Sequence, residues 1–359
     1  MLLPLTIPSI IRLPLLSPFV GNKGSKKYRA IHDGGDYDCI YEAFTGGGGF
    51  TLLHPNAPRV LFGADADPAV RTAWLAMHDD ETRTIAADRI AWWTQQFQGV
   101  PLEQAQRSWR VLREEFNWGG HPATRGKTRL AYYAAASIVI RRLCFGTVLR
   151  TANQPSTTFH GKKLHRLNIA LSYKAEKGKS KLESFQGWQH QWPTPLDHCT
   201  ITTHFNTSAI ALKHSQYQNA IAVIDPPYWV PYEPGTNRRG TGAMTAAYPG
   251  HKPSDDREFG LCIDAINAAF ATGKVKRAVV FNYVSGRLDQ AIRIAAKRWN
   301  MPCHFSNLGP LGNMNNAQQK HGRFDEGVWE LGDRRCFADA VQESLPIAAG
   351  EQLSLLDVA

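Results

Sequence analysis

The predicted fold is decided by residues 220–228, which read Ala-Ile-Ala-Val-Ile-Asp-Pro-Pro-Tyr. Five apolar residues in a row, without polar alternation, are typical of a strand that is buried on both faces of a parallel sheet. Asp225 would then stand at the carboxyl end of this strand. Ligands of open α/β folds bind at this edge of the sheet, so the stretch predicts both a fold class and the position of a site.

Three further apolar runs indicate strands at residues 39–41, 60–64 and 277–283. The first run leads into a block of four glycines, and the second ends at Asp65. A helix-like stretch, residues 256–271, comes before the third run. Because strands that alternate with helices build parallel sheets, we expect an α/β fold with a mostly parallel sheet.

The middle of the chain, residues 81–198, has a different character. Residues 83–117 and 128–143 have the spacing of helices, and their tryptophans, including Trp92, Trp93 and Trp109, are interpreted as core residues. Residues 141–183 include ten basic residues and only two acidic ones. We interpret 81–198 as an inserted, mainly helical, basic domain. It divides a catalytic domain into residues 1–80 and 199–340, and residues 341–359 form a C-terminal tail.

The charge of the chain points to a polyanionic partner. Its 359 residues include 41 lysines and arginines against 31 aspartates and glutamates, a net charge of +10. Such an excess favours nucleic acid above all.

The six cysteines form no Cys-x-x-Cys pair and the thirteen histidines no His-x-x-x-His pair, so we expect no metal site and no disulfide framework. Prolines interrupt the apolar first 20 residues, and no other stretch approaches a membrane span. We expect a cytoplasmic protein without a membrane partner.

The tetrapeptide Asp225-Pro226-Pro227-Tyr228 has the sharpest chemical meaning. The amino group of adenine is a poor nucleophile because its lone pair is delocalised into the ring. The Asp225 carboxylate and the Pro226 carbonyl can accept its two N–H bonds and so direct the lone pair toward a methyl donor. The prolines bring no competing N–H, and the Tyr228 ring can stack on a base that has left the duplex. The alternative is a simple strand-ending turn.

Residues 42–50, Glu-Ala-Phe-Thr-Gly-Gly-Gly-Gly-Phe, form the second motif. Glycines after a strand let the backbone approach a ligand closely. Asp65, one strand later, is placed to accept hydrogen bonds from ribose hydroxyls. The block lacks the Gly-Lys-Ser/Thr ending of a phosphate-binding P-loop, which disfavours that kind of site. The alternative is a flexible surface loop.

Taken together, these motifs resemble the Dam-like, alpha-group DNA adenine N6 methyltransferases. The likeness runs from about Ser17 to about Glu330, in the alpha-group order of cofactor loop, recognition insert and catalytic motif. The segments that carry it, besides the catalytic tetrapeptide, are 19–24 (Phe-Val-Gly-Asn-Lys-Gly), 42–50, 63–68 (Gly-Ala-Asp-Ala-Asp-Pro), 113–117 (Arg-Glu-Glu-Phe-Asn) and 245–248 (Thr-Ala-Ala-Tyr).

The resemblance implies a Rossmann-like S-adenosylmethionine-dependent methyltransferase sheet with an inserted target-recognition domain. The reaction would convert S-adenosylmethionine to S-adenosylhomocysteine and methylate an adenine flipped out of double-stranded DNA, in a bacterial or phage-infected cell. The implied catalytic residues are Asp225, Pro226, Pro227 and Tyr228. The implied cofactor-binding residues are Phe19, Gly21, Lys23, Glu42, Phe44, Gly46, Gly48, Asp65, Asn206 and Asp225. The expected DNA-binding residues are Arg150, Asn153, Lys162, Lys163, Lys174, Lys177, Lys179 and Lys181.

The chain departs from the family pattern at two places. The acid that meets the cofactor adenine in the family is missing from residues 205–208, so Asn206 or Ser208 could replace it with a neutral hydrogen bond. The glycine-rich element after the recognition helix matches only loosely at residues 144–161, which leaves the recognised DNA sequence open.

Two other functions compete with this reading, and the tail suggests a further partner. The first is methylation of cytosine N4 or of an RNA base; Asp225 favours adenine, because cytosine-N4 enzymes more often have Ser there. The second is a non-catalytic DNA-binding relative, against which the intact motifs argue.

In the tail, Gln352–Leu356 (Gln-Leu-Ser-Leu-Leu) resembles the peptide with which bacterial proteins bind the replication sliding clamp.

Overall fold

A computed structural model of the chain describes residues 36–48, 58–97, 100, 102–119, 126–143, 196–228, 256–310 and 325–333. Within these residues a single seven-stranded sheet has the order β3-β2-β1-β4-β5-β7-β6. The strands are β1 (Cys39–Glu42), β2 (Val60–Ala64), β3 (His198–Thr202), β4 (Ala220–Ile224), β5 (Val275–Tyr283), β6 (Cys303–Pro310) and β7 (Asp325–Leu331). The first five pair in parallel, and β7 is antiparallel to both of its neighbours. The expected α/β fold with a mostly parallel sheet is confirmed, and it is compatible with a Rossmann-like fold.

Both faces of the sheet are buried, which explains why its inner strands are apolar without alternation. Successive side chains of a strand point to opposite faces. Ile40, Leu61 and Ile221 therefore contribute to one hydrophobic core. Tyr41 and Phe62, their neighbours in sequence, contribute to the other.

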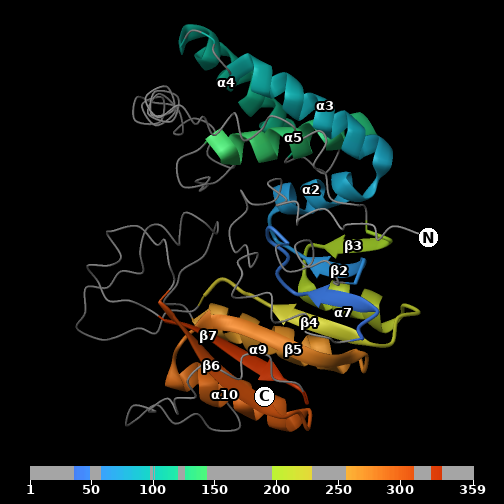
Figure 1. Ribbon diagram of the computed structural model, residues 1–359, viewed down its shortest axis with the longest axis vertical. Coiled ribbons are helices and arrows are strands. Elements are labelled where there is room, and N and C mark those ends of the chain that lie inside the picture. Colours follow the sequence, from blue (N-terminus) through green and yellow to red (C-terminus); the bar gives the residue numbers. More distant parts are fainter. Residues whose placement is uncertain are drawn as a thin grey trace, which may run out of the picture.

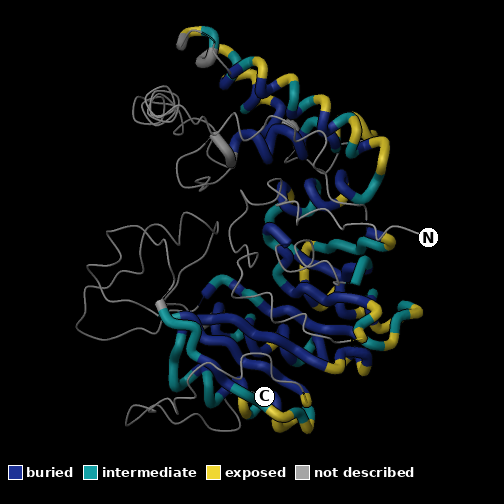
Figure 2. The backbone as a smooth tube through the Cα atoms, in the orientation of Figure 1, coloured by how far each residue is buried: buried dark blue, intermediate teal, exposed yellow. Residues whose placement is uncertain are grey.

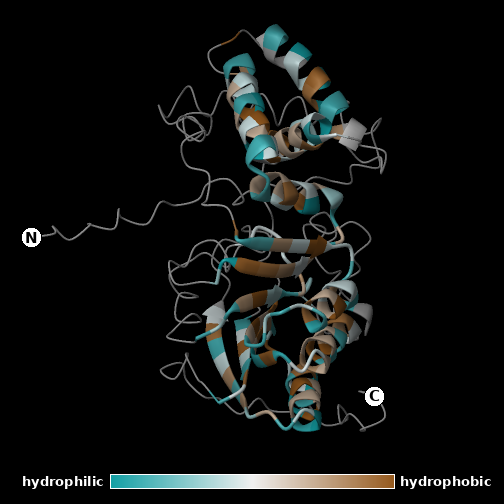
Figure 3. Ribbon diagram, turned by 90° about the vertical axis from the view of Figure 1, so that its right-hand side faces the viewer, coloured by the Kyte–Doolittle hydropathy of each residue, from teal (hydrophilic) through white to brown (hydrophobic). Residues whose placement is uncertain are grey.

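Helices α7 (Phe205–Lys213), α9 (Asp256–Ala271) and α10 (Gly286–Arg298) cover one face of the sheet. A view turned by 90° shows these helices along one side of the layer of strands (Figure 3). Helix α2 (Pro68–His78) packs against β3 from the opposite side. Asp67 begins α2 because its carboxylate accepts the Ala69 N–H at 2.8 Å, and Pro68 has a backbone angle suited to the first helical position.

Three more helices, α3 (Asp80–Phe97), α4 (Leu102–Gly119) and α5 (Lys127–Leu143), lie beyond α2 at one end of the molecule (Figure 1). The stretch 83–117, expected to be helical, is thus divided between α3 and α4. Trp93 and Trp109 are core residues, as expected, but Trp92 is 38% exposed. The buried side chains of α3–α5 join those of α2 and the sheet in one hydrophobic core, so burial is continuous between the two parts (Figure 2).

A buried ion pair fastens α3 to α4. The Arg89 guanidinium contacts the Glu115 carboxylate, which also accepts the Trp93 indole N–H at 3.0 Å. Arg89 lies 3.9 Å from the ring centroid of Trp92 and 4.6 Å from that of Tyr132 on α5. The exposed Trp92 therefore has a local function, since it covers the cation with the face of its ring.

Among the described helices, none is both long and apolar enough to cross a membrane.

Candidate functional site

The strand order reverses between β1 and β4, and the candidate site lies at the carboxyl ends of these strands. The chain runs outward from β1 to β2 and β3 on one side, and from β4 to β5 on the other. In open α/β sheets such a reversal leaves a crevice outside the carboxyl ends, where ligands bind. Glu42 ends β1, and Asp225 directly follows β4. Two predicted site residues thus meet at this point.

Backbone hydrogen bonds join the loops along this edge. The Ala43 N–H donates to the Val223 carbonyl at 3.1 Å, so β1 stays bound to β4 past its end. The Thr45 N–H donates to Ala64 at 2.8 Å, and the Asp65 N–H to Thr202 at 3.0 Å. The segments after β1 and β2 are therefore held to the neighbouring strands by backbone hydrogen bonds.

Residues 43–48, the described part of the glycine loop, rest on Trp74 of α2. Gly46 and Gly48 have positive φ angles of 48° and 59°, which side chains disfavour. A Cβ on Gly48 would lie 1.9 Å from the Trp74 ring, so glycine is required there for space as well. The Trp74 indole N–H donates to the Gly46 carbonyl at 3.2 Å. The sequence predicted glycines for close approach to a ligand; the described contact is with this buried ring.

Asp65 holds the glycine loop from the end of β2. One carboxylate oxygen accepts the Gly46 N–H at 2.9 Å, and the other accepts the Asp67 N–H at 2.8 Å. Asp65 therefore orders the glycine loop at the carboxyl edge of the sheet.

Glu42 is a buried carboxylate at the reversal point, only 3% exposed. Alternation along β1 puts its side chain on the same face as Ile40 and opposite to Tyr41. Burial raises the pKa of the nearby Cys199 thiol to about 12, and the charge of Glu42 contributes to the shift. The two side chains are close enough to interact, although β2 separates their strands.

The beginning of α7 completes the edge beyond the glycine loop. The Tyr41 hydroxyl donates to the Phe205 carbonyl at 3.0 Å, and the Phe205 ring lies 5.7 Å from that of Phe44. Ser208 is fully buried on the side of α7 that faces the sheet, whereas Asn206 is exposed in the first turn. Of the two predicted replacements for the missing acid, Asn206 is the accessible one.

The predicted catalytic tetrapeptide, Asp225–Tyr228, directly follows β4 and is partly buried. Asp225 and Pro227 are half-buried, and Pro226 and Tyr228 are buried. The Tyr228 hydroxyl donates to Glu326 of β7 at 2.6 Å. Its ring meets that of Tyr283 edge to face, with 4.9 Å between the centroids. The aromatic residue of the motif is therefore anchored at the end of the sheet.

The structure brings together, at one edge of the sheet, all the predicted site residues that it describes: Glu42, Phe44, Gly46, Gly48, Asp65, Asn206, Asp225, Pro226, Pro227 and Tyr228. The other predicted cofactor residues, Phe19, Gly21 and Lys23, lie outside the described residues. So do all the predicted DNA-binding residues and the predicted clamp-binding peptide: Arg150, Asn153, Lys162, Lys163, Lys174, Lys177, Lys179, Lys181 and Gln352–Leu356.

The structure adds three residues that sequence reasoning missed: Trp74, Tyr283 and Glu326. Each meets the motifs from a distant part of the chain; Glu326 lies 98 residues after Tyr228. No local pattern marks such residues, because their contacts depend on how the strands are ordered.

In the described part of the chain, no three His, Cys, Asp or Glu side chains are grouped so that they could hold a metal ion. Neither a search with models of known protein families nor a comparison with curated protein sequences finds a match to the chain.

Proposed function

We propose that this protein is an S-adenosylmethionine-dependent DNA methyltransferase that modifies the N6 amino group of adenine. The observation that supports this most is the position of Asp225-Pro226-Pro227-Tyr228. The tetrapeptide follows the strand at which the sheet order reverses, beside the carboxyl end of β1 and its glycine loop. A motif able to activate an amino group thus stands next to a site suited to a nucleoside ligand.

The residues at the edge of β1 and β2 fit the proposed cofactor. S-adenosylmethionine supplies an electrophilic methyl group on a positively charged sulfur when bound, and its amino-acid part bears an ammonium group. The buried Glu42 carboxylate favours such a cationic ligand. The Asp65 carboxylate, directly after β2, is placed like the acids that accept hydrogen bonds from ribose hydroxyls in dinucleotide folds, and Asn206 can hydrogen-bond the adenine.

The tetrapeptide would position and activate the target base. Asp225 and the Pro226 carbonyl accept the two amino hydrogen bonds, and the nitrogen lone pair then points toward the methyl group. A new N–C bond forms as the S–C bond breaks, and the nitrogen subsequently loses a proton to solvent. The Tyr228 ring provides an aromatic surface beside the base.

The cysteines that the structure describes support direct transfer to an amino group. Burial raises the pKa of Cys199, Cys262 and Cys303 to about 12, and it raises the pKa of Cys39 further. These four thiols are therefore protonated at neutral pH and unsuited to attack a base as thiolates. A reaction with a covalent cysteine intermediate is disfavoured within this part of the chain.

Transfer of tritium from labelled S-adenosylmethionine to unmethylated DNA tests the function, and nucleoside analysis identifies the product. We expect N6-methyladenine from the wild-type chain and none from Asp225→Ala, since loss of a positioned acceptor costs about 3 kcal/mol or more of transition-state stabilisation. Asp225→Ala should still bind the cofactor. Asp65→Ala should show the reverse, with cofactor affinity about 10–100-fold weaker and smaller effects on saturated turnover.

Asp38→Ala is the matched control, because Asp38 is an acid at the opposite, amino-terminal edge of the same sheet. It should alter neither cofactor affinity nor turnover. N4-methylcytosine or a methylated RNA base as the product would favour the competing enzymes. DNA binding without any transfer would favour the non-catalytic relative, and normal turnover in Asp225→Ala would rule out the proposed catalytic residue.

A further inference from the structure

Glu326 is a buried carboxylate on β7, two strands away from β4, that contacts the proposed catalytic tetrapeptide. It lies near the start of β7, directly opposite Tyr283 of β5. Directly opposed residues of an antiparallel pair share one face of the sheet, so both side chains point the same way. Glu326 has no measurable exposure and accepts the Tyr228 hydroxyl at 2.6 Å. A short, charge-assisted hydrogen bond of this kind is among the stronger ones in proteins.

Two contacts together define the orientation of the Tyr228 ring. Its hydroxyl is held by Glu326, and its ring meets Tyr283 at an interplanar angle of 79°. Burial raises the pKa of Tyr283 to about 12, and the charge of Glu326 is the second cause of this shift. Glu326 therefore interacts with both tyrosines, Tyr228 and Tyr283. A tyrosine has only two side-chain torsions, and two anchors leave the ring little freedom.

The same anchors constrain Asp225. Only two residues, both prolines, separate Asp225 from Tyr228, and their rings limit backbone rotation. Asp225 is held at its other end by β4, which pairs on both sides. The tetrapeptide is thus fixed at β4 and at Glu326, with a stiff connection between the two points.

We propose that Glu326 is a positioning residue of the methyltransferase: it holds Tyr228, and through it the Asp225 loop, in the geometry that the transfer requires. This inference rests on the proposed function. Glu326 acts through Tyr228 without touching the reacting atoms. Misplacement of a catalytic group by about 1 Å costs about 100-fold in rate, so the expected effect is on turnover.

A mutant cycle in kcat tests the role, with Tyr228→Phe, Glu326→Ala and the double variant. Each single variant should lower kcat about 10–100-fold, while cofactor affinity measured by calorimetry stays within about twofold. The double variant should be no slower than the slower single variant, because both changes remove one contact. Glu326→Gln keeps an oxygen acceptor for the hydroxyl and should recover most of the lost turnover.

Glu330→Gln is the matched control. Glu330 lies on the same strand, is equally buried, and pairs with Arg277 at 2.5 Å instead of with the motif. Its substitution should lower the melting temperature but leave kcat within about twofold of the wild-type value at a temperature where the protein is folded. A loss of kcat in Glu330→Gln as large as that in Glu326→Ala would reveal a general packing effect and overturn the proposal.

Two further outcomes would also overturn it: a folded Glu326→Ala with normal kcat, or losses that multiply in the double variant. If Glu326→Ala fails to fold, Tyr228→Phe carries the test, because it removes the same hydrogen bond and keeps the ring; a folded Tyr228→Phe with normal kcat is then the contrary result. A wild-type chain that transfers no methyl group overturns the proposed function and the positioning role together. That case is distinct, because every variant and the control are then equally inactive.

Discussion

At the scale of single residues, Gly48 and Trp74 show that the glycine loop, which the sequence suggested could be a flexible surface loop, is restricted in conformation and in space. Gly48 has a positive φ angle and lies directly against a ring that is 1% exposed. Trp74 also binds the Gly46 carbonyl, so the same side chain supports the loop at two points. Packing against Trp74 therefore explains why glycines are found in this loop, in addition to any role toward a ligand.

Gly48→Ala should destabilise the protein by about 2 kcal/mol or more. The new methyl group would overlap the Trp74 ring, which adds an overpacking cost of about 1–3 kcal/mol to the cost of a left-handed backbone, about 1 kcal/mol. Gly273→Ala is the matched control, since Gly273 has a φ of 72° and open space around its Cβ position. Its loss should be only about 1 kcal/mol. Urea unfolding of both variants measures the difference, and equal losses would contradict the role of Trp74.

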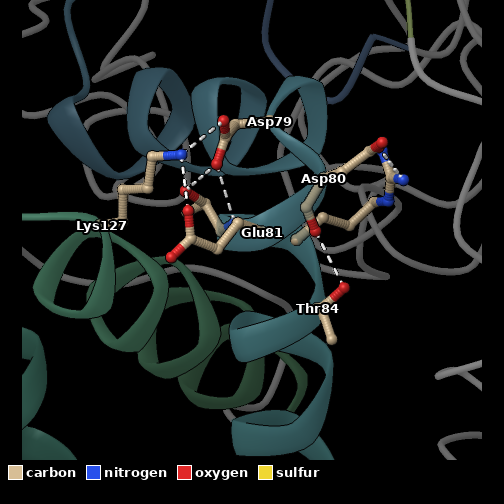
Figure 4. Close-up of polar contacts among 7 residues, drawn as sticks. Asp79, Asp80, Glu81, Thr84 and Lys127 are labelled. Carbon is tan, nitrogen blue, oxygen red and sulfur yellow. Dashed lines mark hydrogen bonds and ion pairs between the residues drawn. The ribbon is translucent and has the colours of Figure 1, made fainter.

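At the scale of elements, Asp79 controls the junction between α2, α3 and α5 (Figure 4). Its carboxylate accepts the Thr82 N–H at 2.9 Å and the Thr82 hydroxyl at 2.6 Å, so it caps the start of α3. Lys127, at the start of α5, contacts both Asp79 and Glu81 at 3.1 and 2.7 Å. One half-buried acid thus joins the ends of three helices.

The pKa of Asp79 falls from its ordinary value of 3.8 to about 2, first because of the Thr82 hydrogen bonds and then because of Lys127. A lowered pKa means that the charged form is preferred in the folded state. The stabilisation is therefore complete above about pH 4 and is lost as the pH falls toward 2.

Asp79→Ala should lower the free energy of unfolding by about 1 kcal/mol at pH 7, the usual value of an N-cap. The difference from the wild-type protein should shrink as unfolding is measured at pH 4, 3 and 2. Asp88→Ala, in the middle of α3 and exposed, is the control and should leave the free energy of unfolding at pH 7 nearly unchanged. A constant difference for Asp79→Ala across this range would contradict the charged cap.

At the scale of the whole molecule, the net charge of +10 predicts an electrostatic surface for DNA. The basic stretch after residue 141 follows α5, which belongs to the group of helices beyond α2 (Figure 1). The expected phosphate contacts are Lys174, Lys177, Lys179 and Lys181, all outside the described residues.

Changing these four lysines to Gln should weaken binding to every DNA sequence alike. Each lost phosphate contact lowers the slope of log K against log salt by about 0.9, so the slope should fall by about 3 to 4. Sequence preference should survive, because phosphate contacts position a protein without reading bases. Binding titrations at several salt concentrations measure both effects.

Four exposed cations on the other part of the molecule provide a control with the same change in charge: Lys213, Lys276, Lys297 and Arg298. Their replacement by Gln should leave the slope nearly unchanged. Equal effects of the two sets would mean that binding depends on net charge alone, and the basic stretch would have no special role.

Part of this architecture was predictable from the sequence, because it depends on local patterns. The apolar run 220–224 is β4 and the helix-like stretch 256–271 is α9, each with the expected bounds. Both are recognisable because a strand buried on two faces and an amphipathic helix each leave a pattern of apolar residues within one short stretch of sequence. The same reasoning put Asp65 and Asp225 at strand ends, and hence at one edge of the sheet.

The remaining features were decided by the tertiary structure. Strand β7 lies between β5 and β6 and has acids at three of its seven positions, so nothing in its sequence identifies a buried central strand. Only this position of β7 brings Glu326 to Tyr228, and only the packing of α2 brings Trp74 under Gly48. A sequence pattern reflects interactions between residues that are close along the chain. Contacts between distant side chains depend on strand order and helix packing, and these contacts determined how the motifs are held in place.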